Sequence, residues 1–263
     1  MMGDAISAPA SRREIGALDL LDLQLINQRS GSDALPYPFM LTRPTRFEFV
    51  DEMAGYASQL RDRLHSGDLS PFAGCVAALA RADITVTGHV QYVPAETPSI
   101  RVLAVRAGQA GYMLEQRADA DVVDVYALSP LELGSAIAAA MRLEHPGSHP
   151  RILNPEYVSA RSAAADEDTV VVRRGISTDA GVTVSFSQLT AYATVQSHWR
   201  PLREWGIDPR QESLIWVRIK DDGDYLGASD RSSGTPLTVS RLRERIDGLI
   251  AADVEALREY SDE

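Results

Sequence analysis

The sequence predicts an α+β fold with a pseudo-two-fold internal repeat. Residues 99–141 and 213–250 share one succession of features: a strand that ends on a basic residue, a glycine turn, a strand with a tyrosine, a polar loop and an amphipathic helix. The middle of the chain holds several short alternating or β-branched runs, which are typical of antiparallel strands. Two copies of a unit predict two half-sheets joined into one core, although short units of this kind also look alike by chance.

The composition limits the classes of function. A chain of 263 residues with 44% hydrophobic content can bury a large core. Its one cysteine, Cys75, allows no disulfide within the chain, so a cytoplasmic location is expected. The net charge of −11, without a dense Lys/Arg cluster, argues against nucleic acid as a partner. No apolar run is long enough for membrane insertion.

The organisation along the chain follows from these patterns. Residues 1–14 lack the apolar segment of a signal peptide and are expected to form a disordered leader. Residues 15–153 are the predicted first half-repeat of a single domain, and residues 154–260 are the second. A Pro- and Ala-rich stretch from Asn154 to Asp168 joins the two halves.

Helical spacing of apolar residues dominates the start of the chain. It predicts helices from Arg12 to Asn27, from Phe47 to His65 and from Pro71 to Arg81. Ser66-Gly67-Asp68 should end the second of these helices, and Phe39 to Thr42 could be a short strand.

A meander of strands is predicted next. Its strands run over Ile84 to Val93, Ile100 to Arg106, Gly111 to Gln116 and Val122 to Ala127. A helix to about Arg142 should follow, because Ser129-Pro130-Leu131-Glu132 combines a capping serine, a proline at the first helical position and a glutamate at the third.

The second half is predicted from similar patterns. Thr169 to Phe186 reads as two strands around a turn at residues 178–181, and Ser187 to Trp205 has helical spacing. Strands from Ser213 to Lys220 and from Asp224 to Ser229 should flank the Asp222-Gly223 turn. Thr238 to Tyr260 is the predicted final helix.

Motifs that carry chemistry are weak in this chain. His145 and His149 are separated by Pro146-Gly147, so they do not share a helical face that could hold a metal. Lys220 to Asp224 begins like a calcium loop but lacks the later ligands, and a hairpin turn explains it better. Cys75 lies in an apolar helical segment, which is typical of a buried cysteine. The sequence therefore predicts no catalytic residue, no metal site and no cofactor.

One strand suggests a contact surface. Alternation from Ser213 to Lys220 places Leu214, Trp216 and Arg218 on one face, and Ile215, Val217 and Ile219 on the other. A solvent-facing strand that carries Trp and Arg has the composition of an interface. The alternative is that Leu214 and Trp216 pack under the last helix while the basic ends reach water. The predicted partner-binding residues are Leu214, Trp216, Arg218, Tyr225 and Leu226.

The chain resembles the EspG family of actinobacterial type VII (ESX) secretion chaperones over most of residues 17–258. The residues that carry the resemblance are Leu35-Pro36-Tyr37-Pro38-Phe39, the segments RDRLHSGDLS and LARADITVTGHV, the strand pair and helix from Ile100 to Met141, Gly223-Asp224-Tyr225-Leu226, Ser233-Gly234-Thr235 and the final helix.

The resemblance implies a central, largely antiparallel β-sheet flanked by two helical bundles. It also implies a cytosolic, non-catalytic chaperone that binds the tip of a helical PE–PPE heterodimer, mainly through the sheet and the second-half bundle. The family pattern would make Asp168 to Phe186 mostly helical, whereas the valines there argue for strands, so Tyr157 to Arg173 is favoured as helix and Val182 to Phe186 stays open. The rival functions are a small-molecule-binding domain or enzyme, and a scaffold that forms a homodimer through the same sheet.

Overall fold

A single large β-sheet organises the molecule. The computed structural model describes residues 12–29, 35–93, 96–118, 120–154, 181–200 and 205–262. Within this part of the chain the strand order is β1-β5-β4-β3-β2-β8-β9-β10-β11-β6-β7. All neighbouring strands of this order run antiparallel except β6 and β7, which are parallel. The predicted α+β class with a largely antiparallel sheet is confirmed.

The bounds of the elements are as follows. The first half contains β1 (Arg13–Asp19), α1 (Leu20–Arg29), α2 (Val50–Ser66), the 3₁₀ turn Ser70–Phe72, α3 (Ala73–Ala80), β2 (Ile84–Tyr92), β3 (Ile100–Ala107), β4 (Ala110–Gln116), β5 (Val122–Leu128), α4 (Leu133–Ala140) and β6 (Ile152–Leu153). The second half contains β7 (Val182–Thr183), the 3₁₀ turn Phe186–Gln188, β8 (Leu189–His198), β9 (Ser213–Ile219), β10 (Gly223–Gly227), β11 (Ser233–Pro236) and α6 (Val239–Asp262).

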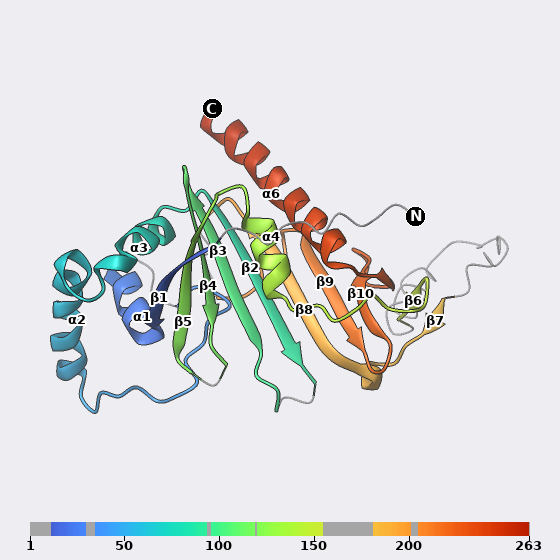
Figure 1. The fold of residues 1–263 in the computed structure, drawn as a ribbon, viewed down its shortest axis with the longest axis horizontal. Coiled ribbons are helices and arrows are strands. Elements are labelled where there is room, and N and C mark those ends of the chain that lie inside the picture. Colours follow the sequence, from blue (N-terminus) through green and yellow to red (C-terminus); the bar gives the residue numbers. More distant parts are fainter. Residues whose placement is uncertain are drawn as a thin grey trace, which may run out of the picture.

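The two halves have matching element orders. Strands β2 and β8 pair antiparallel near the middle of the sheet, with Gly88 opposite Val195. From this centre, β2-β3-β4-β5 forms one meander that leads into α4, and β8-β9-β10-β11 forms another that leads into α6 (Figure 1). A duplicated unit requires such an order, whereas the superposition of the two halves stays a prediction.

Helices α4 and α6 cover one face of the sheet across both halves (Figure 1). Their apolar side chains join those of the central strands in one large cluster, which includes Ile137, Leu242 and Ile246. Gly88 on β2 lets α4 come close, because a Cβ there would lie 2.8 Å from the Met141 sulfur. The core is therefore shared by the two halves.

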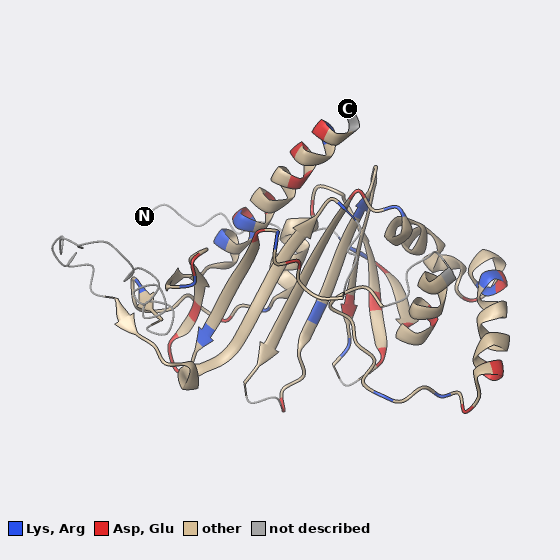
Figure 2. Cartoon of the chain, turned by 180° about the vertical axis from the view of Figure 1, so that it is seen from behind, with Lys and Arg blue, Asp and Glu red and all other residues tan. Residues whose placement is uncertain are grey.

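The opposite face is covered unevenly. Helices α1 and α3 pack on the first-half strands, and α2 lies outside them; together they bury Leu103, Val105 and Leu114 of that face. Figure 2 shows this face from the front, with α1, α2 and α3 over one end and the surfaces of β2, β8 and β9 uncovered by any described helix. We call this uncovered part of the sheet the open face.

The predicted first helix is wrong in its first half. Residues Arg13–Asp19 form β1 at the sheet edge and pair with β5, with Leu18 opposite Val123. The helix begins only at Leu20, where the Asp19 carboxylate accepts the Leu21 amide at 2.8 Å. Pairing with a distant strand decided the conformation against the local helical spacing. Phe39 to Thr42 also forms no strand; Phe39 is buried against the helices, and the Met40 backbone bonds to the Gln116 side chain.

The predicted helix from Ser187 to Trp205 is wrong as well. Leu189–His198 is the central strand β8, hydrogen-bonded to β2 along one edge and to β9 along the other. Its alternate residues Ala191, Ala193 and Val195 are buried under α4 and α6. Two-sided pairing satisfies the whole backbone, which outweighs a weak local preference.

The predicted capping serine is also wrong. The Ser129 hydroxyl accepts only the Leu131 amide, at 3.3 Å, within a turn, and α4 begins at Leu133 after an N-cap at Glu132 that has no side-chain cap. The other predicted strands and helices of the described chain are confirmed to within a few residues at their ends. The expected disordered leader of residues 1–14 is wrong at its end, because Arg13 and Glu14 belong to β1 and pair with β5. The expectations for residues 1–11 and 155–180, including most of the joining stretch and the helix near Tyr157 to Arg173, lie outside the described residues. No described helix is long and apolar enough to cross a membrane.

Candidate docking surface

In the predicted contact strand, β9, Leu214 and Trp216 lie on one face and Ile215 and Val217 on the other, as alternation requires. The expectation that Trp216 faces water is wrong. Leu214, Trp216 and Leu226 all belong to the core cluster beneath α4 and α6, and Trp216 is fully buried. The two helices cover this side of β9, so the alternative of packing under the last helix holds for Leu214 and Trp216. The structure leaves untested whether any of these residues contributes to binding.

Arg218 is buried rather than extended to water. Its guanidinium donates to Asp224 at 2.7 Å, to Glu144 at 2.7 Å and to the Arg142 carbonyl at 3.0 Å. Asp224 is fully buried and also accepts the Glu144 amide at 2.7 Å. Burial works against the charge of Arg218, but Asp224 and Glu144 raise its pKa above the usual value. This network ties the segment after α4 to β9 and β10.

Tyr225 is the fifth predicted contact residue, and it is buried too. Its hydroxyl donates to Asp222 at 2.5 Å and accepts the His149 amide at 2.9 Å. Burial and the bond to Asp222 raise the pKa of Tyr225 to about 12. The segment that holds His145 and His149 is thereby attached to β10. No group of three metal-binding side chains occurs among the described residues.

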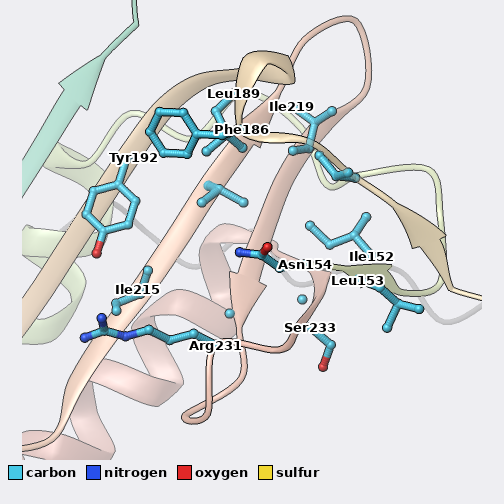
Figure 3. Close-up of a pocket in the computed structure, with 14 residues that line it drawn as sticks. Ile152, Leu153, Asn154, Phe186, Leu189, Tyr192, Ile215, Ile219, Arg231 and Ser233 are labelled. Carbon is cyan, nitrogen blue, oxygen red and sulfur yellow. The ribbon is translucent and has the colours of Figure 1, made fainter. Parts of the chain in front are cut away.

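The exposed apolar side of β9 is the one that carries Ile215 and Val217. Together with Ile219 they line a pocket of about 200 Å³ on the open face (Figure 3). Its full lining is Ile152, Leu153, Asn154, Val184, Phe186, Leu189, Tyr192, Ile215, Val217, Ile219, Gly227, Arg231, Ser233 and Gly234. Figure 3 shows Phe186, Leu189 and Tyr192 on one side of the pocket, with Ile152 and Leu153 opposite.

The chemistry of this pocket suits apolar side chains. Its floor is aliphatic and its rim is aromatic, and Phe186 is 68% exposed. The polar side chains of the lining are Asn154, Arg231, Ser233 and the Tyr192 hydroxyl. An exposed apolar concavity with a few polar groups is typical of a docking or ligand site.

The sequence places the expected contact surface on the side of β9 that packs under α4 and α6, whereas the pocket lies on the other side of that strand. Both sides of β9 are apolar, so alternation alone could not tell which side the helices cover. The residue pattern leaves the conformation at Phe186 open and predicts a helix at Tyr192, so neither residue is expected beside β9. The available signal was the aliphatic triplet Ile215, Val217 and Ile219, which is unusual for a solvent-facing strand.

Comparison with known proteins gives a structural match. No family model matches the chain, and neither does any curated protein. Among solved structures, the type VII secretion system chaperone EspG5 of Mycobacterium tuberculosis, in complex with a PE25–PPE41 dimer, matches with a TM-score of 0.52. The alignment covers 91% of this chain and 96% of that chain at 11% sequence identity. At such identity the likeness concerns the fold, and the chain therefore shares its fold with a type VII secretion chaperone.

Proposed function

We propose that this chain is a non-catalytic chaperone or adaptor of an actinobacterial ESX secretion system. In the cytoplasm it would hold a helical PE–PPE-like heterodimer before export. The observation that carries the proposal is the exposed apolar pocket along β9 on the open face, within a fold shared with a chaperone whose structure contains a PE–PPE dimer. Apolar grooves recognise amphipathic helices by taking up their apolar anchors.

An internal repeat would explain why this surface is available. We propose that residues 15–153 and 154–260 are half-repeats of one domain related by a pseudo-two-fold axis. Leu103 and Val105 on β3 are buried beneath α1 and α3. Ile215 and Val217, on the matching strand β9, are only half-buried. A partner helix on the open face would then occupy the place that α1 and α3 fill in the first half.

In this proposal the five predicted partner-binding residues hold the docking surface in place from behind. Leu214, Trp216 and Leu226 fix β9 and β10 to the helices from behind, while Arg218 and Tyr225 fix the neighbouring segments. They position the strands whose other side carries the docking surface.

Co-expression with candidate PE–PPE pairs tests the proposal, with size-exclusion chromatography as the readout. Phe186→Ala and Val217→Asp should reduce co-elution, because the first removes an exposed aromatic anchor and the second places a charge in the pocket. Leu131→Ala is the matched control, since Leu131 is 88% exposed and does not line the pocket. Co-elution that survives both pocket variants, or that no helical pair produces, would contradict the proposal.

The pocket itself favours one second candidate, a binding site for a small apolar molecule. Its volume of about 200 Å³ would hold such a ligand, and Asn154, Arg231 and Ser233 could orient a polar end. Native mass spectrometry of the purified protein would reveal a retained ligand. This candidate would be favoured over the adaptor if Val217→Asp lost the ligand and no helical pair co-eluted with the wild-type protein.

A further inference from the structure

A row of polar residues crosses the open face beside the apolar pocket. His89 on β2 lies directly opposite Arg101 on β3, and on its other side it faces Thr194 on β8. Thr194 in turn faces Ile215 of the pocket. Three strand spacings separate Arg101 from Ile215, which corresponds to roughly 14 Å. One docked protein could therefore span the pocket and this polar cluster.

Two nitrogen atoms of the cluster are buried without a hydrogen-bond partner among the described residues. The Arg101 Nε and the His89 Nε2 have no hydrogen-bond partner in the described part of the chain. His89 is only 8% exposed. The nearest polar group is the Tyr37 hydroxyl, 3.4 Å from the His89 Nδ1. Buried polar atoms without partners are rare in folded proteins, because each one loses its water without compensation.

Arg101 also lacks a counter-charge. No described carboxylate lies within ion-pair distance of its guanidinium, whereas Arg106 on the same strand pairs with Asp83 at 2.8 Å. Burial lowers the pKa of Arg101 below the usual value, because part of the charged guanidinium is withdrawn from water. Burial, helped by the charge of Arg101, also lowers the pKa of His89 to about 4, so the imidazole is neutral at pH 7. The cluster thus carries one positive charge that no described carboxylate compensates, beside two buried nitrogens without partners.

We propose that Arg101, His89 and Tyr37 form a carboxylate-binding site that takes an acidic side chain of the protein docked on the open face. A carboxylate would supply both the missing charge and the missing acceptors, and its two oxygens match the fork of a guanidinium. Trp205, which is 50% exposed and packs edge-on against Tyr37 with ring centroids 5.1 Å apart, borders the site. This inference rests on the proposed function. It adds a requirement: the partner carries an Asp or Glu about 14 Å from the apolar residue that enters the pocket.

The first arm of the test uses the free protein and acetate as the probe. Acetate should shift the His89 ring resonances saturably in NMR spectra, and Arg101→Gln should abolish the shift. Arg241→Gln is the matched control, because Arg241 is an exposed arginine on α6, over the other face. Arg101→Gln should keep or raise the melting temperature, since it removes an unpaired charge. Wild-type protein without a saturable shift would overturn the site.

The second arm uses the complex. Arg101→Gln should weaken capture of the helical pair by at least about tenfold, while Arg241→Gln leaves it unchanged. If Arg101→Gln captures the helical pair as well as wild type does, the carboxylate does not come from the docked protein. When the acetate response of wild-type protein is intact, that result identifies a free carboxylate as the ligand. Failure of every helical pair to bind wild-type protein would refute the proposed function and the protein source, while the acetate arm still decides whether the site exists.

Discussion

Replacing Trp216 by alanine should destabilise the fold rather than remove a binding contact. Trp216 is fully buried in the cluster beneath α4 and α6, and it lies behind the strand whose other side forms the pocket. Its indole ring also packs against the Arg218 guanidinium, 5.5 Å from the ring centroid. The substitution therefore leaves a large cavity at the junction of the sheet and both helices.

The size of the effect follows from burial. A buried Trp→Ala change costs about 3–5 kcal/mol of unfolding free energy. For a domain of this size each kcal/mol shifts the melting temperature by about 2–4 °C, so a fall of roughly 6–20 °C is expected. Trp216→Phe should cost less than about 2 kcal/mol, because it keeps a ring in place and removes an indole N–H that has no partner among the described residues.

Calorimetry and co-elution with a helical pair, measured on the same samples, separate the two roles of Trp216. Trp216→Phe should retain capture, and Phe186→Ala should lose capture with an unchanged melting temperature, since Phe186 is largely exposed. The reasoning would be refuted by a Trp216→Ala protein that keeps the wild-type melting temperature and yet fails to bind. That result would mean that Trp216 becomes exposed and contacts the partner directly.

Three further predictions concern stability. Asp224→Ala should lower the free energy of unfolding in urea by about 3–5 kcal/mol, because it leaves Arg218 buried beside one remaining carboxylate. Glu144→Ala should cost less than about 1 kcal/mol, because the Glu144 carboxylate is mostly exposed. Equal losses in the two variants would contradict this reasoning. Because the pKa of His89 is lowered to about 4 in the fold, the unfolded chain takes up the extra proton as the pH falls from about 6.5 toward 4, and about 3 kcal/mol of stability is lost in that window. His89→Gln should flatten this part of the pH profile, and a profile identical to wild type would refute the assignment. Gly88→Ala should cost about 1–3 kcal/mol by thermal unfolding, because the new Cβ would lie 2.8 Å from atoms on β3 and at the end of α4; an unchanged melting temperature would show that α4 can move away.

Much of the architecture could be predicted from local patterns. Strands β2 to β5, β9 and β10 were identified by alternating residues between short turns, and α6 by its apolar stripe. The Asp222-Gly223 turn was identified by residue type, and Gly223 indeed has a φ of 142°. These features depend on neighbours in the sequence, so the sequence was sufficient to find them.

The sequence by itself therefore determined the fold class, the succession of most elements and the apolar character of β9. The tertiary structure decided that Arg13–Asp19 and Leu189–His198 are strands, that Trp216 faces the helices and Ile215 the open face, and that His89 lies opposite Arg101. Each of these outcomes depends on a partner far away in the chain: a strand edge to pair with, a helix that covers one face, or a cross-strand neighbour. Such contacts are fixed by the free energy of the whole packed sheet, which no local pattern of residues contains.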